Sequence, residues 1–344
     1  MFEKLLKKNG NIITDEKIPE FKKIKNIASN KGLNLFSLLE KKNNFQFLSH
    51  QYKGESQLLG IRYNDSTHII KLNLIGKVQF KNVLMAVIAS IRSNINIKDI
   101  LNVIPKIKSV EGRFEQVGKI KNNSKVIVDY AHTPDALKTC LKDIKDQFVG
   151  HKINLVFGCG GNRDQNKRAK MGKIADLFSD KIYLTDDNPR LEQASKIRKQ
   201  IKKGIKKQKV LEFPNRAKAI SEAIKHLKIG EILIVAGKGH EKVQEIGGKK
   251  FFFSDKKIIL DAIKIKNFSL SNNLKVNIFN ELSGEKKVSS NIIFKKARIN
   301  SKEIKKNDVF FAIKGKKNDG NQFISEAFKK NASVAVVNKI EKKI

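Results

Sequence analysis

Between about residue 109 and residue 265, short β-rich runs alternate with amphipathic helical stretches, and this alternation constrains the fold more than any other feature. Strand–helix repetition indicates βαβ units and a mostly parallel sheet covered by helices on both faces. The predicted fold class is therefore α/β, with a Rossmann-like sheet. Because ligands bind beyond the carboxyl ends of such strands, we expect the chemistry in the loops that follow them. The predicted strands are 125–130, 153–158, 181–186, 209–213 and 231–237, and the predicted helices are 134–147, 167–179, 194–207 and 216–228.

The regions before and after this alternating region differ from it in composition and pattern. Before the alternating region, short apolar segments mix with Lys/Asn-rich loops, and the clearest element is a predicted helix at 80–92. After it, a Lys/Asn/Ser-rich stretch at 264–273 predicts a linker. A new unit follows, with a predicted strand, helix and strand at 307–315, 323–331 and 332–338, and we expect it to be incomplete because the chain ends soon after. The predicted parts are 1–108, 109–265, a linker at 266–273, and 274–344.

The formal net charge of +37 raises nucleic acid as a partner. However, the basic residues are 62 Lys and only 9 Arg, spread along the whole chain. Nucleic-acid readers favour Arg and cluster their charge, so a compositional bias of the genome is the preferred interpretation, with attraction of phosphorylated substrates as an alternative. The two cysteines have no CxxC spacing. No apolar run reaches the roughly 18 residues that span a bilayer, and no signal-peptide pattern occurs, so the expected compartment is the cytoplasm.

The first distinctive loop is DYAHTPDAL, at residues 129–137. Thr133 followed by Pro134 suits a helix start, with Thr as the N-cap and Pro at the first helical position. Asp129 has the chemistry to accept hydrogen bonds from ribose hydroxyls. The alternative is that Asp129 and His132 only cap the turn.

The second loop is GCGGNRDQNKR, at residues 158–168. Its glycines allow close approach of the backbone to a ligand, and Arg163, Lys167 and Arg168 are expected at its rim. It matches neither G-x-G-x-x-G nor a Walker A motif, so it is a weak phosphate signature, and a solvated turn is the alternative.

The third and fourth loops are TDDNPR (185–190) and AGKGHE (236–241). Asn188 and Arg190 can present an amide and a guanidinium to a carboxylate. In the fourth loop two glycines flank Lys238, and Glu241 follows; alone, this string also fits an ordinary turn. An Arg-rich pair of loops together with an acid suits a zwitterion that bears both a carboxylate and an ammonium group.

These motifs, in this order, resemble the C-terminal domain of the Mur ligases of the diaminopimelate-adding (MurE) type. The match runs from EGRFE (111–115) to FSD (253–255). The resemblance implies an ATP- and Mg²⁺-dependent amide ligation in peptidoglycan synthesis. The carboxylate of UDP-MurNAc-L-Ala-D-Glu would become an acyl phosphate, which the amine of meso-diaminopimelate would attack. Positioning and charge neutralisation supply most of the rate in such phosphoryl transfers.

The resemblance also implies residue roles. It assigns no catalytic or metal-binding residue to this chain. GKVQFKN (76–82) resembles the adenine-contacting segment at the end of the family's central ATPase domain, which implies that residues 1–108 are the C-terminal part of that domain. The same segment implies a nucleotide contact at Asn82, although Gln79 stands where the family usually has Asn. The residues implied to hold diaminopimelate are Arg163, Asn188, Arg190, Gly237 and Glu241, and the other implied nucleotide contacts are Arg113, Asp129, Tyr130 and His132.

The family's phosphate-binding loop has no counterpart here, because no G-x-x-x-x-G-K-[ST] string occurs. We therefore expect the chain to be a fragment that is inert alone, with an upstream Mur ligase fragment as a candidate partner. The stretch 299–337 resembles the uridine-binding N-terminal domain of the Mur ligase that adds D-Ala-D-Ala (MurF), but Asn300-Ser301-Lys302 replaces the usual Asp-Ser-Arg.

Two other classes of function stay open from the sequence. The first is a non-catalytic binding or scaffold module of a fused cell-wall ligase. The second is a basic nucleic-acid binder, which would show a steep salt dependence because phosphate contacts release counterions. We expect neither nucleic-acid binding nor membrane insertion.

Overall fold

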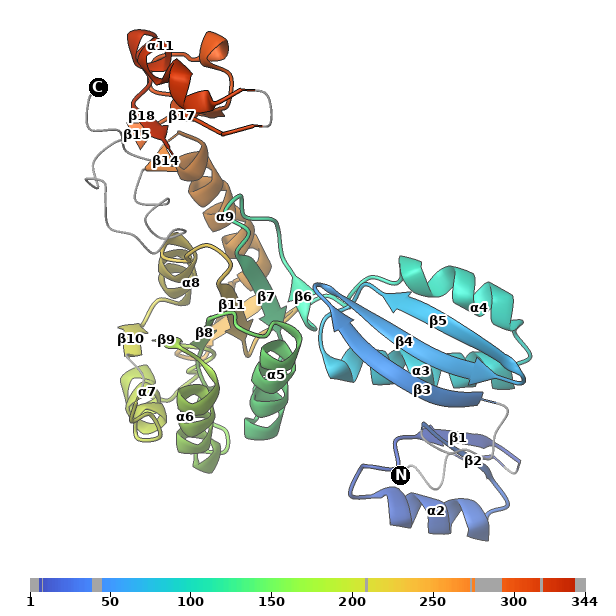
Figure 1. Ribbon diagram of the computed structural model, residues 1–344. Helices are drawn as coiled ribbons and strands as arrows, with labels where there is room; N and C mark the ends of the chain where they lie inside the picture. The colour runs from blue at the N-terminus through green and yellow to red at the C-terminus, as the bar shows by residue number, and fades with distance from the viewer. Residues whose placement is uncertain are drawn as a thin grey trace. The chain divides into compact units, whose positions relative to one another are not determined.

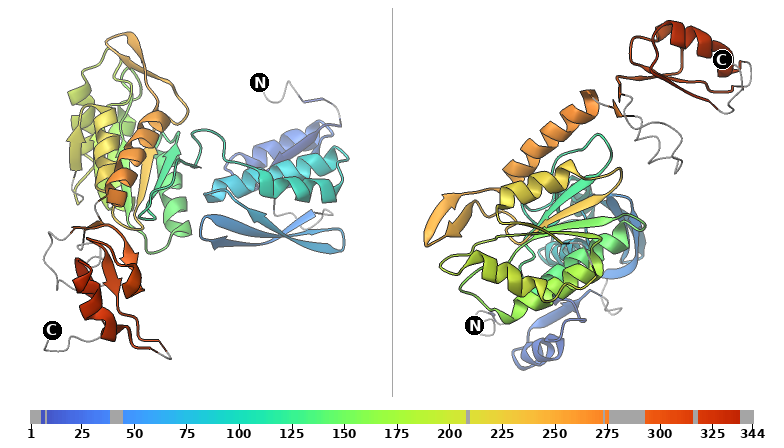
Figure 2. Two further views of the ribbon diagram at one scale, coloured as in Figure 1. Left: turned by 90° about the horizontal axis from the view of Figure 1, so that it is seen from above. Right: turned by 90° about the vertical axis from the view of Figure 1, so that its left-hand side faces the viewer.

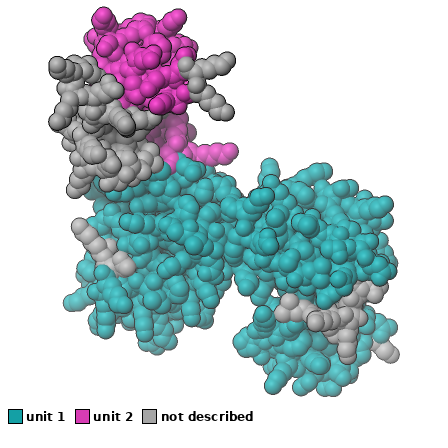
Figure 3. Space-filling view, viewed as in Figure 1, with its two compact units in different colours: residues 1–118, 123–260 teal, residues 119–122, 261–344 magenta. Residues whose placement is uncertain are grey.

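The computed structural model divides into two compact units, residues 1–118 with 123–260 and residues 119–122 with 261–344 (Figure 3). The boundary expected between residues 108 and 109 falls inside the first unit, and it stays a prediction. The structure describes residues 6–7, 9–38, 45–207, 210–272, 274–275, 293–315 and 318–337.

The centre of the first unit is a six-stranded sheet in the order β10-β9-β8-β11-β7-β6. All neighbouring strands are parallel except β6, which runs antiparallel to β7 at the edge. The middle strands are buried along their whole length, as expected for a sheet covered on both faces. The strands are β6 (Glu115–Gln116), β7 (Lys125–Asp129), β8 (Ile153–Phe157), β9 (Lys181–Thr185), β10 (Val210–Phe213) and β11 (Ile232–Ala236).

Helices cover both faces of this sheet, which confirms the predicted Rossmann-like α/β class. Helices α5, α6 and α7 lie on one face, and α8 with the start of α9 lies on the other (Figures 1 and 2). Helix α5 begins as predicted, because the Thr133 hydroxyl accepts a hydrogen bond from the Ala136 N–H at 3.3 Å and Pro134 opens the first turn. The helices are α5 (Pro134–Gln147), α6 (Asn166–Phe178), α7 (Ala194–Lys202), α8 (Arg216–Lys225) and α9 (Asp255–Asn272).

The stretch expected to be a linker is largely helical, and its role as a linker stays a prediction. Helix α9 continues through Asn272, so most of 264–273 is helical rather than extended. The frequent Lys and Asn residues of this stretch favoured a linker by composition. Ile263, just before the stretch, is a buried residue of the same helix.

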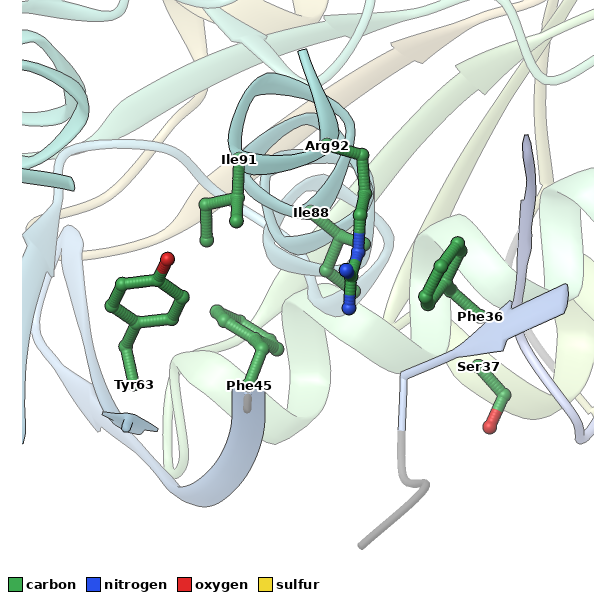
Figure 4. Close-up of a pocket in the computed structure, with 7 residues that line it drawn as sticks. All are labelled: Phe36, Ser37, Phe45, Tyr63, Ile88, Ile91 and Arg92. Carbon is green, nitrogen blue, oxygen red and sulfur yellow. The ribbon is translucent and has the colours of Figure 1, made fainter. Parts of the chain in front are cut away.

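The first part of the chain builds two smaller sheets. Strands β1 and β2 are parallel and are joined through α2, while β3, β4 and β5 form an antiparallel meander against α3 and α4. A small pocket lies between β2, the meander and α3, where the guanidinium of Arg92 stacks 4.0 Å from the ring centre of Phe36 (Figure 4). The elements are β1 (Asn11–Thr14), α2 (Phe21–Asn30), β2 (Asn34–Ser37), β3 (Phe45–Lys53), β4 (Ser56–Tyr63), β5 (Ser66–Leu72), α3 (Lys77–Arg92), α4 (Ile97–Val103) and the 3₁₀ turn η1 (Ile104–Lys106).

The second unit contains a three-stranded parallel sheet in the order β16-β17-β18. The predicted strand, helix and strand are present at β17, α11 and β18, each shorter than its predicted range. Its elements are β14 (Leu274–Lys275), β15 (Ile293–Phe294), β16 (Ala297–Arg298), η2 (Ser301–Glu303), β17 (Val309–Phe311), η3 (Gly320–Phe323), α11 (Ile324–Lys329) and β18 (Val334–Val336). The hairpin strands β12 (Val243–Ile246) and β13 (Lys249–Phe252) belong to the first unit.

Candidate functional site

The four loops singled out in the sequence leave the same edge of the six-stranded sheet. Strands β7, β11, β8 and β9 are adjacent and parallel, so their carboxyl ends lie side by side. The first and fourth loops are joined directly, because the Gly237 N–H donates to the Asp129 carbonyl at 3.1 Å. The expectation that polar loops gather at this edge is confirmed.

A buried lysine lies at the centre of the site. The side chain of Lys238 is 0% exposed, and its Nζ donates to Asn188 Oδ1 at 2.8 Å and to Glu241 Oε2 at 3.2 Å. The carboxylate of Asp187 lies 3.9 Å from the same nitrogen. Asn188 completes the group by donating from Nδ2 to Glu241 Oε2 at 3.2 Å. The structure therefore brings together two of the expected diaminopimelate residues, Asn188 and Glu241, around a cation.

Glu241 also connects to the first loop. The Tyr130 hydroxyl donates to Glu241 Oε1 at 3.3 Å, and burial, together with this carboxylate, raises the pKa of Tyr130. The guanidinium of Arg113 lies 4.6 Å from the centre of the Tyr130 ring, a cation–π contact. The chain of contacts Arg113–Tyr130–Glu241 joins residues expected on the nucleotide side to residues expected on the amino-acid side.

Both oxygens of Asp129 are used by the backbone. Oδ2 accepts from the Phe114 N–H at 3.0 Å and Oδ1 accepts from the Ala131 N–H at 2.9 Å, while burial raises the pKa of the carboxyl. His132 is exposed and its Nδ1 contacts the Tyr130 carbonyl at 2.9 Å. These contacts match the turn-capping alternative for both residues. Each carboxylate oxygen has a second lone pair, so the predicted ribose contact of Asp129 stays a prediction.

The glycine-rich loop brings two arginines to its surface. An added Cβ at Gly160 would lie 2.9 Å from Arg190 Nη1 and 3.8 Å from Arg163 Cγ, so both side chains flank this glycine. Arg190 Nη1 donates to the Gly161 carbonyl at 2.9 Å, and its Nε lies 3.2 Å from Glu245 Oε2. Arg163 is exposed and forms no hydrogen bond or ion pair with any residue that the structure describes.

Gly237 has a steric role in the same site. Its φ of 116° disfavours a side chain, and an added Cβ would lie 2.7 Å from Asp187 Oδ2. The glycine therefore allows the fourth loop to approach the acid of the third loop.

Arg168 was expected at the rim of the loop, and that expectation is wrong. Its side chain is 0% exposed, and Nη1 and Nη2 donate to the two oxygens of Glu192 at 2.6 and 2.7 Å. Nη2 also donates to the Gly160 carbonyl at 3.1 Å, and Glu192 in turn accepts from the Asn162 N–H. The pair holds the glycine-rich loop in place and does not face a ligand.

The Arg168–Glu192 pair gives a pH prediction. Arg168 lowers the pKa of Glu192 from 4.5 to about 2, so its stabilisation is present above pH 4.5 and is lost as the pH falls towards 2. We expect Glu192→Gln to cost about 2 kcal/mol of unfolding free energy at neutral pH, as for hydrogen bonds between charged partners. The cost should shrink steadily in urea unfolding measured from pH 5 down to pH 2.

Glu20→Gln is the matched control for this measurement, because Glu20 is exposed and makes no side-chain capping bond to α2. Its effect should stay near zero at every pH. A Glu192→Gln penalty that is the same at pH 5 and pH 2 would contradict the assigned pKa.

A second buried ion pair lies beneath the fourth loop. Arg216 Nε and Nη2 donate to the two oxygens of Asp255 at 2.8 and 2.7 Å, and Nη2 also donates to the Ala236 carbonyl at 3.0 Å. Both side chains are 0% exposed. The pair ties α8 and α9 to the last residue of β11, from which the AGKGHE loop departs.

The predicted nucleotide contact Asn82 is not joined to the others. It is exposed on α3, and its side chain has no hydrogen-bond partner among the described residues. Gln79, the residue that departs from the family pattern, instead lies 8% exposed and places its Nε2 3.4 Å from the Arg113 carbonyl. The start of α3 therefore reaches the EGRFE segment through Gln79.

Three residues of the site were missed as functional candidates: Asp187, Lys238 and Gln244. Gln244 donates to the Asp187 carbonyl at 2.7 Å and supports the third loop from the β12–β13 hairpin. A lysine between two glycines at a strand end, with an acid three residues later, was the available signal for Lys238. Its burial was not predictable from that spacing.

Comparisons with known proteins place this chain among its relatives. Residues 112–239 match the family model described as "Mur ligase, glutamate ligase domain", and residues 294–343 match "Mur ligase family, catalytic domain". The fold is shared with solved Mur ligases, among them a MurF from Thermotoga maritima in complex with ADP, at 15% identity and a TM-score of 0.54 over 76% of this chain and 55% of that chain. The chain belongs to the Mur ligase family, whose members are ATP-dependent, amide-forming ligases.

Relatives with more sequence in common carry a narrower name, UDP-N-acetylmuramoyl-L-alanyl-D-glutamate–2,6-diaminopimelate ligase. The protein of that name from Rickettsia montanensis is 36% identical over 258 residues, 75% of this chain and 53% of the relative. The one from Buchnera aphidicola subsp. Baizongia pistaciae is 40% identical over 248 residues, 69% of this chain and 49% of the relative. A solved structure of that name has 27% identity and a TM-score of 0.56, over 75% and 53% of the two chains. The chain spans about half the length of these relatives.

Proposed function

We propose that this chain forms the amino-acid-binding part of an ATP-dependent ligase that adds meso-diaminopimelate to UDP-MurNAc-L-Ala-D-Glu in the cytoplasm. The names of the relatives support this proposal. The observation that carries it is the cluster of Asn188, Lys238 and Glu241 beside Arg190, because this cluster offers a carboxylate for an ammonium group next to donors for a carboxylate. Within the described residues, no helix is both long and apolar enough to cross a membrane.

The distal end of diaminopimelate carries both an ammonium and a carboxylate. Glu241 Oε1 accepts a hydrogen bond from Tyr130 and keeps a lone pair for the ammonium. Asn188 and Arg190 are assigned to the distal carboxylate, with Arg163 alongside. Gly237 keeps the fourth loop close to Asp187, because a side chain at this position would meet Asp187 Oδ2.

The nucleotide is assigned to the neighbouring first loop. Arg113, Tyr130, Asp129 and His132 are the proposed contacts, with Asn82 further along α3. ATP would supply the phosphoryl group that activates the substrate carboxylate as an acyl phosphate. This chain contributes no phosphate-binding loop, so we expect it to be inert alone.

Mg²⁺ has no evident place among these residues. In the described part of the chain, no group of three or more His, Cys, Asp or Glu side chains is arranged to hold a metal ion. We propose that a partner, an upstream Mur ligase fragment, holds the metal ion.

The last part of the chain is proposed to begin a second Mur ligase, of the D-Ala-D-Ala-adding type. The family match at residues 294–343 supports a Mur ligase origin. Within it, Ser301 is buried and its hydroxyl donates to Glu326 Oε2 at 2.8 Å. That hydroxyl is already used, so we expect weak nucleotide-sugar binding there.

Isothermal titration with meso-diaminopimelate tests the main proposal. Binding of meso-diaminopimelate with clear preference over L-lysine is expected, since only the former has a second carboxylate. Phosphate release from ATP, with both substrates present, should stay at background. Absence of binding to a folded protein would refute the site, and robust phosphate release would refute the expected inactivity.

A further inference from the structure

Lys238 has no assigned role, yet it is the only fully buried lysine among the buried residues that the structure describes. Burial of an ammonium is costly unless acceptors surround it, and here an amide and two carboxylates do so. We propose that Lys238 is a positioning residue that sets the selectivity of the site for a distal group bearing both a carboxylate and an ammonium. The inference rests on the proposed function and deepens it.

The first part of the argument is the orientation of the Asn188 amide. Its Oδ1 accepts from Lys238 Nζ at 2.8 Å and from the Glu245 N–H at 3.0 Å. Two donors at one atom fix that atom as the oxygen, so the NH₂ group must point the other way. One of its protons is directed to Glu241 Oε2 at 3.2 Å, and the other remains to donate to a ligand carboxylate. Lys238 thus makes Asn188 a donor towards the ligand.

The second part is the balance of charge. Asp187 and Glu241 bring two negative charges to within 3.9 and 3.2 Å of Lys238, which cancels one of them. Arg216 and Arg190 have their own partners in Asp255 and Glu245. Among Asp187, Glu241 and Lys238, one net negative charge is therefore left, and a single ligand ammonium balances it. Without the lysine, two uncancelled carboxylates would repel a ligand carboxylate and attract an additional cation, an effect that partial burial strengthens.

Lys238→Met keeps the length of the buried stem and removes the charge. We expect the affinity for meso-diaminopimelate to fall while that for L-lysine is retained or rises, so that the ratio of the two dissociation constants shifts on the order of 10-fold. Titration calorimetry measures both. Lys242→Met, at an exposed lysine next to the same loop, is the matched control and should leave the ratio unchanged.

A purely structural lysine would lower the melting temperature and weaken both ligands equally, and an unchanged ratio in folded Lys238→Met would overturn the proposal. If the wild type binds neither amino acid, the proposed function is refuted and the ratio says nothing about Lys238. A measurement without ligand tests the role of Lys238 in that case. The Asn188 side-chain NH₂ signal in asparagine-¹⁵N-labelled protein is identified by its loss in Asn188→Asp. We expect that signal to shift and to exchange faster with water in Lys238→Met but not in Lys242→Met; an unmoved signal would overturn the assigned orientation.

Discussion

Replacing Arg190 with glutamine is expected to weaken meso-diaminopimelate binding on the order of 100-fold, because about 3 kcal/mol from charge-assisted hydrogen bonds to the distal carboxylate would be lost. The wild-type guanidinium is held in advance by the Gly161 carbonyl at 2.9 Å and by Glu245 at 3.2 Å. Little side-chain entropy therefore remains to be lost on binding. Titration calorimetry of the purified variant measures the change.

L-Lysine makes this experiment specific. It lacks the second carboxylate, so its affinity should change little in Arg190→Gln. Arg62→Gln, at an exposed arginine of β4, is the matched control and should bind both ligands like the wild type. Equal loss of both ligands would place Arg190 elsewhere than at the distal carboxylate, and no loss at all would remove it from the site.

Breaking the buried Arg216–Asp255 pair is expected to have the largest effect on stability. Asp255→Ala leaves a guanidinium with 0% exposure and without its hydrogen-bonded carboxylate, which costs about 3–5 kcal/mol. For a folded unit of this size, that loss lowers the melting temperature by roughly 10 °C. Urea unfolding gives the free energy, and scanning calorimetry gives the temperature.

An exposed ion pair on α9 provides the comparison. Asp261 and Lys264 are more than half exposed and 3.8 Å apart, so Asp261→Ala should cost less than about 1 kcal/mol. The double variant Arg216→Met with Asp255→Leu should recover much of the loss, since apolar replacement of both partners removes the unpaired charge. A small effect of Asp255→Ala alone would mean that water or another group compensates the arginine.

The positions of the strands and helices around the sheet were largely predictable, because buried parallel strands are continuous apolar runs and helices are periodic. Helix α5 was predicted to the residue, since Thr133 and Pro134 mark its start in the sequence itself. The gathering of four loops at one edge followed from parallel topology alone. These features depend on local pattern and on one rule of connectivity.

The burial of charged side chains was not predictable in the same way. In the sequence, Arg168 at the start of α6 and Lys238 in the fourth loop look like solvated residues. Arg168 is buried against Glu192, and Lys238 is buried against Asn188 and Asp187, all of which are distant in sequence. The continuation of helix α9 to Asn272 was not predicted, because the Lys/Asn-rich composition of this stretch was given more weight than the spacing of its apolar residues. In each case, the deciding partner is supplied by tertiary structure.

The contacts between α5 and the start of α3 limit how such ligases can be recombined. Gln147 accepts from the Gly76 N–H and donates to the Gly54 carbonyl, both at 2.9 Å, while Asp143 accepts from the Val78 N–H at 3.2 Å. A chimera joined at residue 109 would match these side chains with a foreign helix start and leave buried amide groups unbonded. A graft that carries residues 45–260 together keeps these contacts between α5 and the start of α3. The exchangeable module is therefore larger than the domain predicted at 109–265.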